Sequence, residues 1–128
     1  MLSETAVRAK AAKWADAWNR GDADGVLRHY AEDVVYASPF VTDLGGLRSP
    51  ALRGAGPLRG FVRDVLSAYP ELRIEVLHVL RGVRSMTIVH RGLGGQVFAE
   101  VMVLDDEGLA ARASVHVGTG VITPRPAA

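Results

Sequence analysis

A single carboxyl group stands in an otherwise apolar stretch of the second half of the chain. Glu100 is the only charged residue in residues 97–104, whose sequence is VFAEVMVL. If Phe98 and Met102 enclosed this carboxyl in a pocket, the loss of hydration would raise its pKa and suit it to general acid or base catalysis. The alternative is an outer-face glutamate paired with an arginine. The residues alone leave both interpretations open.

Two histidines have the chemistry of a general base. His90 and His78 each lie on the more apolar face of a segment in which apolar and polar residues alternate, and imidazole titrates near neutral pH. A hydrogen-bonded core histidine is the alternative for both. Whether His90 shares a face with Glu100 depends on the intervening turn, because a shift of one residue in register moves a side chain to the other face. The sequence leaves that question open.

The sequence contains no motif for a metal site, a reactive thiol or a nucleotide-binding loop. There is no cysteine, which excludes disulfides, thiolate ligands and a thiol nucleophile. His29 and His116 are expected at the surface or at an interface, and no two histidines have a spacing that brings them together as metal ligands. The glycine-rich stretch lacks the G-x-x-x-x-G-K-[ST] motif. We therefore expect neither a metal nor a cofactor.

The charge balance argues against nucleic-acid and membrane partners. The 128 residues carry 15 Lys and Arg against 14 Asp and Glu, a formal net charge of +1, which gives no field that would attract nucleic acid or anionic lipid. No apolar run approaches the roughly 20 residues of a membrane span, and the N-terminal residues do not resemble an export signal. The length fits one domain, expected in the cytoplasm.

Two helices are expected at the N-terminus. Ser3 is a typical N-cap residue, and apolar residues recur at steps of three and four as far as Trp18, so a helix is predicted to end near Gly21. Asp22 can cap a second, shorter helix, whose predicted inner face includes Tyr30.

A long loop and a third helix follow. Residues 41–57 hold four glycines and two prolines and predict a loop of the kind that forms lids or rims. From Leu58 to Leu66 the apolar spacing again predicts a helix, which Tyr69 and Pro70 terminate.

The remaining segments are predicted strands. Helices that precede a meander of antiparallel strands indicate an α+β domain, and a strongly curved sheet with helices on its concave face would leave a conical cavity. The expected strands are residues 34–40, 72–81, 86–90, 96–104 and 109–117.

Four short motifs in a fixed order resemble the NTF2-like superfamily, with the SnoaL-like proteins and the ketosteroid isomerases as its nearest branches. They are W-x3-W-x2-G-D at residues 14–22, YAEDVVY at residues 30–36, SPF at residues 38–40 and LRG at residues 52–54. The resemblance implies a cone-shaped, cystatin-like α+β barrel in which three N-terminal helices pack on a strongly curved antiparallel sheet. It also implies a homodimer. The chain itself predicts one domain over residues 1–117 and, from the prolines of the tail, a C-terminal arm over residues 118–128.

The resemblance also shows where the isomerase machinery is replaced. The position of the isomerase base is Ser38, whose hydroxyl has no useful basicity at neutral pH. The tyrosine position is Trp14, which can donate a hydrogen bond but not accept one, and the aspartic acid position is Glu100, which keeps a carboxyl. Steroid isomerisation by the family's mechanism is therefore not expected.

The function expected is cofactor-independent acid–base chemistry of the SnoaL-like kind, namely isomerisation, cyclisation or hydration of an apolar molecule that bears a carbonyl. Glu100 would act as acid or base, with His90 as a further candidate base, and Trp14 and Ser38 would position the substrate oxygen. The alternatives are a ligand-binding or accessory domain without catalysis and a dimeric module with a collapsed cavity. The residues expected to bind the ligand, with core packing as the alternative, are Trp18, Tyr36, Phe40, Phe61, Phe98 and Met102.

Overall fold

The structure, a computed structural model, describes residues 1–41 and 51–120. Within them the helices are α1 (Glu4–Asn19), α2 (Ala23–Leu27), α4 (Ala55–Ala68) and a short 3₁₀ helix, η1 (Leu93–Gly95). The strands are β1 (Tyr30–Ala37), β2 (Ala51–Arg53), β3 (Glu75–Arg81), β4 (Ser85–Arg91), β5 (Val97–Leu104) and β6 (Ala110–Val117).

The first helix forms as the sequence predicts. The Ser3 hydroxyl accepts a hydrogen bond from the backbone N–H of Ala6, which satisfies one of the free donors at the start of α1. The buried face of the helix runs from Val7 to Trp18 at steps of three and four. Beyond its end Gly21 adopts a φ of 68°, a left-handed conformation that glycine reaches without steric cost.

The second helix is shorter than expected, and Tyr30 lies outside it. The side chain of Asp22 accepts a hydrogen bond from the N–H of Gly25, and α2 then ends at Leu27. The prediction of Tyr30 on a helix face is wrong, because Tyr30 begins β1 and pairs with Ala110 of β6. The hydrogen bonds of that strand pairing outweigh the helical pattern of the local sequence.

The helix α4 follows a strand that the sequence analysis assigned to a loop. Residues 51–53 form β2, which pairs with the end of β1, and the rest of the expected loop, residues 42–50, lies outside the described residues. Helix α4 begins at Ala55 with Pro57 in its first turn, a position where the missing N–H of proline costs nothing. It ends ahead of Pro70, as predicted.

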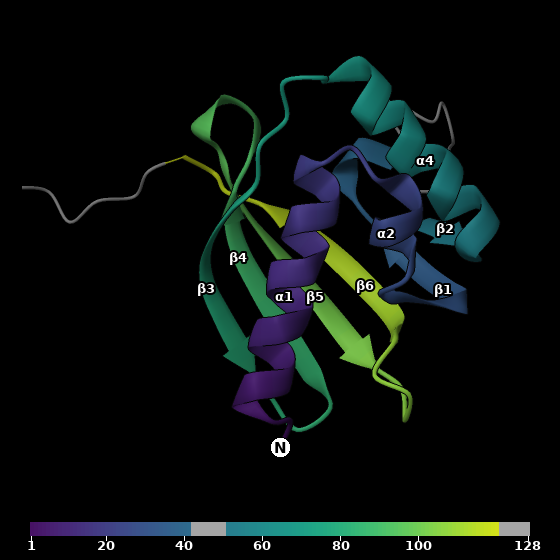
Figure 1. The fold of residues 1–128 in the computed structure, drawn as a ribbon, viewed down its shortest axis with the longest axis vertical. Coiled ribbons are helices and arrows are strands. Elements are labelled where there is room, and N and C mark those ends of the chain that lie inside the picture. The colour runs from purple at the N-terminus through teal and green to yellow at the C-terminus, as the bar shows by residue number, and fades with distance from the viewer. Residues whose placement is uncertain (42–50, 121–128) are drawn as a thin grey trace, which may run out of the picture.

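The six strands form one sheet in the order β2-β1-β6-β5-β4-β3 (Figure 1). All neighbouring pairs are antiparallel except β1 and β6, which run parallel. The expectation of a wholly antiparallel sheet is wrong at this pair, because most of the chain separates the two strands and no hairpin fixes their directions.

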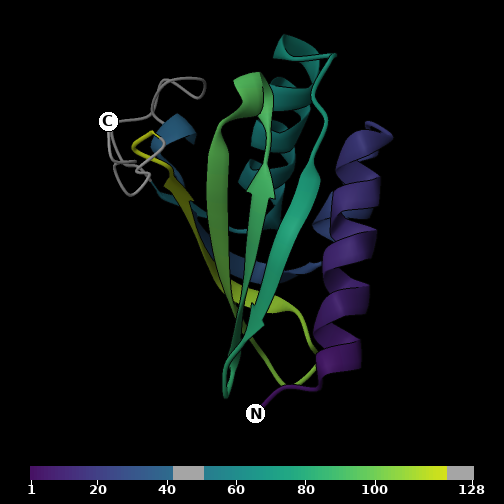
Figure 2. The ribbon, with the colours of Figure 1, turned by 90° about the vertical axis from the view of Figure 1, so that its left-hand side faces the viewer.

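The helices cover one face of the sheet. Figure 2 shows α1 and α4 on the same side of it, with β1 running across the direction of β3 and β4 because the sheet is strongly curved. Val26, Leu58, Ile88 and Met102 are fully buried between these layers. The predicted α+β fold with helices packed on a curved sheet is confirmed. Among residues 1–41 and 51–120, no helix is both long and apolar enough to cross a bilayer.

Candidate active site

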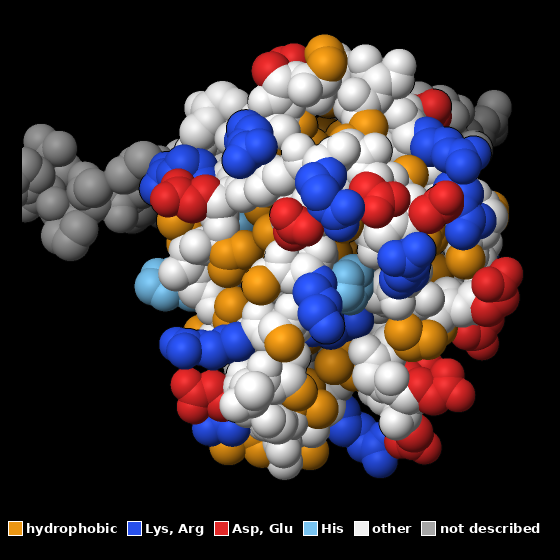
Figure 3. Space-filling model, in the orientation of Figure 1, with side chains coloured by type: hydrophobic (Ala, Val, Ile, Leu, Met, Phe, Trp, Pro, Cys, Tyr) orange, Lys and Arg blue, Asp and Glu red, His pale blue; other side chains and the backbone are white. Residues whose placement is uncertain are grey.

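A cavity of about 360 Å³ lies between the helices and the sheet. Near the top of the face seen in Figure 3, a hollow holds hydrophobic side chains where α4 ends and the chain turns towards β3. The cavity walls are mainly aromatic and aliphatic. The predicted site residues that line it are Trp14, Trp18, Tyr36, Ser38, Phe40, Phe61, His90, Phe98 and Glu100.

Met102 is the one predicted ligand-binding residue that the structure places elsewhere. It lies on the same face of β5 as Glu100, opposite Met86 and Ala113, but is fully buried and absent from the cavity wall. The cavity reaches Glu100 and Phe98 on this face but does not extend along β5 to Met102. Met102 belongs to the core beneath the site.

Glu100 is buried at the end of a chain of hydrogen bonds. Only 3% of its surface is exposed, and its Oε2 accepts a hydrogen bond from the Tyr30 hydroxyl. That hydroxyl in turn accepts a hydrogen bond from Trp14 Nε1 at 3.0 Å. Within the described residues no hydrogen bond reaches Oε1 of Glu100. Since Glu100 lines the cavity, this second oxygen is available to a ligand.

The surroundings of Glu100 bring the pKa of its carboxyl close to neutral pH. Burial raises the pKa of Glu100 to about 7, against the opposing effects of the Tyr30 hydrogen bond and the charge of Lys10. An ordinary glutamate is fully ionised at neutral pH. Glu100 is therefore present in both its acidic and its basic form there, as a proton-transfer group requires.

The structure resolves which face His90 occupies. His90 lies opposite Phe98, and Ile88 opposite Glu100, so His90 and Glu100 share the inner face of the sheet. His90 Nδ1 lies 3.2 Å from the Ile88 carbonyl oxygen. Because that oxygen can only accept, Nδ1 carries the proton and donates, and Nε2 of the neutral ring is unprotonated. Burial lowers the pKa of His90, and the ring lies edge-on to Trp14 and stacked on Phe98. A neutral imidazole with a free Nε2 is a suitable base.

Tyr36, rather than Trp14, has a hydrogen-bond donor that is available in the cavity. Because the Trp14 N–H is bonded to Tyr30, the expectation that Trp14 donates to a substrate oxygen does not fit the geometry. The Tyr36 hydroxyl lines the cavity without a hydrogen-bond partner among the described residues. Burial, and to a lesser extent the charge of Glu100, raises the pKa of Tyr36. The Tyr36 hydroxyl therefore stays protonated and can donate a hydrogen bond.

Ser38 and Trp18 are the remaining polar groups of the predicted set. The Ser38 hydroxyl accepts a hydrogen bond from the N–H of Phe40 at 3.2 Å, a turn contact that leaves its own proton free to donate. Trp18 packs edge-on against Trp14, and its buried Nε1 has no hydrogen-bond partner among the described residues. Both residues line the cavity. Within the described part of the chain, no base is hydrogen-bonded to the Ser38 hydroxyl to make it a nucleophile.

Tyr30 is a site residue that the sequence analysis missed. It was assigned to a helix, whereas its hydroxyl joins Trp14 to Glu100. A usable signal was present, because Tyr30, Val34 and Tyr36 have the even spacing of a strand face and all three are buried.

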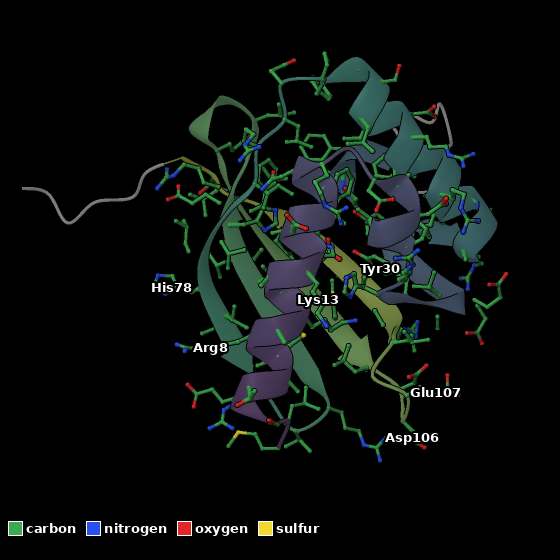
Figure 4. The ribbon with its side chains drawn as sticks, viewed as in Figure 1. Arg8, Lys13, Tyr30, His78, Asp106 and Glu107 are labelled. Carbon is green, nitrogen blue, oxygen red and sulfur yellow. The ribbon has the colours of Figure 1, made fainter. Side chains whose placement is uncertain are left out.

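The other histidines lie outside the cavity. A β-bulge between Val76 and His78 shifts the alternation by one residue, so His78 is exposed on the outer side of β3, and Figure 4 shows it pointing away from α1. His29 was expected at the surface or at an interface but is half-buried beside Lys10. In residues 1–41 and 51–120 no cluster of three His, Asp or Glu side chains is placed to hold a metal ion.

The sequence of the whole fold matches a known family model. Residues 11–121 match the SnoaL-like domain. The chain belongs to the SnoaL-like family. A SnoaL-like protein of unknown function from Burkholderia thailandensis is 30% identical, with a TM-score of 0.86 over 91% of this chain and 97% of that one.

Two further structures share the SnoaL-like fold at lower identity. A protein of unknown function with a cystatin-like fold from Methylobium petroleophilum is 16% identical, with a TM-score of 0.72 over 94% of this chain and 81% of that one. SalBIII, an epoxide hydrolase/cyclase-like enzyme in pyran ring formation in the polyether salinomycin, is 18% identical, with a TM-score of 0.70 over 93% of this chain and 95% of that one. Comparison with curated proteins finds no match.

Proposed function

We propose that this SnoaL-like protein is a cofactor-independent acid–base enzyme. Its substrate is an apolar small molecule with a carbonyl group, which it isomerises, cyclises or hydrates inside the cavity. One observation carries the proposal: a buried carboxyl, Glu100, and an unprotonated imidazole nitrogen, His90 Nε2, share one wall of an aromatic cavity. Carboxyl and imidazole are the usual partners in proton transfer to and from carbon.

The two groups have different parts in the reaction. His90 Nε2 removes a proton from the carbon next to the carbonyl. The Tyr36 hydroxyl and the protonated form of Glu100 donate hydrogen bonds to the oxygen on which negative charge develops. The enolate then takes the proton back from the imidazolium at another carbon, which isomerises the substrate. Alternatively, it attacks a second carbonyl carbon of the same molecule, whose π electrons move to its oxygen. That oxygen takes the proton from the imidazolium, and the ring closes as an alcohol.

The spacing of the two groups suits a small carbonyl unit. His90 and Glu100 are diagonal neighbours on adjacent strands, a relationship in which α-carbons lie about 7–8 Å apart. A carbonyl and its neighbouring carbon fit between the two side chains. Trp14 and Tyr30 act as positioning residues, because they hold Glu100 Oε2 and leave Oε1 to the substrate.

The aromatic walls support an apolar substrate. Phe40 and Phe61 join Phe98 around the cavity, and a volume of about 360 Å³ is near the lower end of the usual range for ligand pockets. The cyclase-like enzyme SalBIII shares this fold, which is in keeping with ring closure as one member of the proposed reaction class.

The test is a pH–rate profile on a panel of enones and polyketide-like ketones. The wild-type protein should show an ionisation near pH 7, the pKa that burial gives Glu100. Glu100→Gln should abolish that ionisation and reduce turnover by about 100-fold or more. The matched control is Glu107→Gln, in the exposed turn between β5 and β6, which should leave the profile unchanged.

Two outcomes would contradict the proposal. If Glu100→Gln keeps full turnover, the carboxyl has no catalytic part. If panel compounds raise the melting temperature without being converted, the cavity only binds, and the protein is a ligand-binding or accessory domain.

We also propose that two copies associate through the face of the sheet opposite the described helices. The helices lie on the opposite side (Figure 2). By strand register, Val89, Ala99 and Val101 share the outer face of the central strands, and all three are only partly buried. Adjacent small apolar side chains on a face of this kind suit a self-complementary contact about a two-fold axis.

A further inference from the structure

A second hollow, also of about 360 Å³, lies at the other end of α1. It is formed by the first three turns of α1, the end of α2 and the turn between β5 and β6, and it shares no lining residue with the first cavity. Nothing in the proposed reaction uses it. Its walls combine two kinds of side chain, basic and aliphatic.

The basic side chains converge on His29. Lys10, Lys13 and Arg28 line the hollow with it, and Figure 3 shows a histidine near the centre of this face bordered by Lys and Arg side chains. Lys10 Nζ donates to the His29 carbonyl oxygen at 2.9 Å and lies 3.4 Å from His29 Nδ1. Burial and the charges of Lys10 and Lys13 lower the pKa of His29 to about 4, so both partners of Lys10 are neutral at pH 7.

The positive charge of this cluster has no direct counter-ion. Among the described residues, no carboxylate lies within ion-pair distance of Lys10, Lys13 or Arg28. Burial lowers the pKa of Lys10 to about 8, although the charges of Glu100 and Asp105 oppose that change. The nearby acidic residues Asp106 and Glu107 lie on the β5–β6 turn, below Lys13 and Tyr30 in Figure 4. A concave site with uncompensated positive charge attracts anions.

The rest of the wall is aliphatic. Leu2, Val7, Leu104 and Leu109 face the hollow beside the basic cluster. An anion that uses both parts has a charged head and a short apolar tail, because the tail removes aliphatic surface from water. The volume suits a small molecule of this kind.

We propose that this hollow is a second binding site, for a small amphipathic anion whose carboxylate or phosphate head is held by Lys10, Lys13 and Arg28. The proposal does not rest on the reaction proposed for the first cavity, although the charge of Lys10 also lowers the pKa of Glu100.

The test is a titration of the full chain with octanoate and with octyl phosphate, followed by amide chemical shifts and by calorimetry. Both probes should bind and perturb the amides of Lys10, His29 and Leu109. The neutral analogue 1-octanol should bind at least about tenfold more weakly, and added salt should weaken both anions. The stronger of the two anions identifies the preferred head group.

Substitutions of the basic residues distinguish binding in this hollow from non-specific electrostatic attraction of the anion. Lys10→Gln should weaken octanoate binding by about tenfold, and Lys13→Gln and Arg28→Gln by smaller factors, because their side chains are more exposed. The matched control is Arg63→Gln on α4, which is exposed and lines neither hollow, and it should bind as the wild type does. If Lys10→Gln does not fold, the double variant of Lys13 and Arg28 replaces it and should again lose about tenfold in affinity.

Three results would overturn the inference. The first is equal binding of 1-octanol and octanoate. The second is unchanged affinity in a folded Lys10→Gln protein or in the double variant. The third is a set of shifts confined to Phe61, Phe98 and Glu100, which would place the anion in the first cavity.

Discussion

The hydroxyl of Tyr30 donates a hydrogen bond to Glu100 from a position 70 residues earlier in the chain. The bond crosses β6, because Tyr30 begins β1 and Glu100 lies on β5. It fixes one carboxyl oxygen and leaves the other beside the cavity. The reactivity of Glu100 therefore depends on how β1 and β5 are placed relative to each other.

Removal of the Tyr30 hydroxyl should raise the pKa of Glu100 above about 7. The hydrogen bond from Tyr30 lowers this pKa and so opposes the effect of burial, and Tyr30→Phe deletes it while the apolar surroundings remain. The titration of the Glu100 side-chain carbon, followed by ¹³C NMR, measures the change. The control Tyr36→Phe leaves the Tyr30 hydrogen bond in place and should move the pKa less. A pKa that falls or stays constant in Tyr30→Phe would show that the hydroxyl does not stabilise the carboxylate.

Replacement of His90 should abolish proton removal while ligand binding persists. His90→Gln keeps a polar side chain of similar size but has no basic nitrogen, so turnover should fall by about 100-fold or more with little change in the affinity for a panel ketone. Steady-state kinetics and calorimetry separate the two effects. His116→Gln, on the exposed side of β6, is the matched control. Equal losses of turnover in both variants would argue against His90 as the base.

Glu100 should make the protein less stable as the pH rises. Its pKa is about 7 in the folded protein against 4.5 for an unperturbed glutamate, so the folded state holds a proton that the unfolded chain releases. The free energy of unfolding should therefore decline between pH 4.5 and 7, by on the order of 3 kcal/mol in all, and then level off. Urea unfolding of wild type and Glu100→Gln across this range measures the contribution as a difference.

The comparison with Glu100→Gln is needed because the titration of a histidine changes the free energy of unfolding in the opposite direction. The pKa of His29 is lowered to about 4 from 6.5, so its contribution to stability rises with pH between these values. This contribution is common to both proteins and cancels. Parallel curves for the wild type and Glu100→Gln would contradict a raised pKa.

A lysine on the outer face of the sheet should separate the proposed dimer. Val101→Lys places a charge at the centre of the proposed contact, where burial of an unpaired charge is unfavourable, and light scattering after size-exclusion chromatography should report a monomer. Val83→Lys is the control, since Val83 is 75% exposed between β3 and β4. A wild-type protein that elutes as a monomer would refute the dimer directly.

The sequence predicted the elements whose signals are local. The cap at Ser3, the apolar steps to Trp18 and the terminating Gly21 together define α1. The apolar run around Glu100 predicted a strand, but the face of its carboxyl was expected mainly from the resemblance to the family, because an almost wholly apolar strand does not show which face is inner.

The errors arose where distant residues decide the outcome. Tyr30 joins β1 because Ala110 pairs with it, and His78 turns outward because of a bulge in the pairing of β3 with β4. The face of His90 depends on the register set by the turn before β5, and the direction of β1 against β6 depends on the course of the whole chain. Apart from the even spacing of Tyr30, Val34 and Tyr36, none of these features has a signal within a few residues of the position concerned.

The parallel pairing of β1 with β6 also bears on how the protein is made. Val35 and Tyr36 pair with Arg112 and Ala113, so one edge of β1 has no partner until almost the whole chain has left the ribosome. Contacts between such distant segments form slowly, and an unpaired strand edge is open to wrong partners in the meantime. The nascent polypeptide must therefore keep β1 from associating with other chains until its last strand is synthesised.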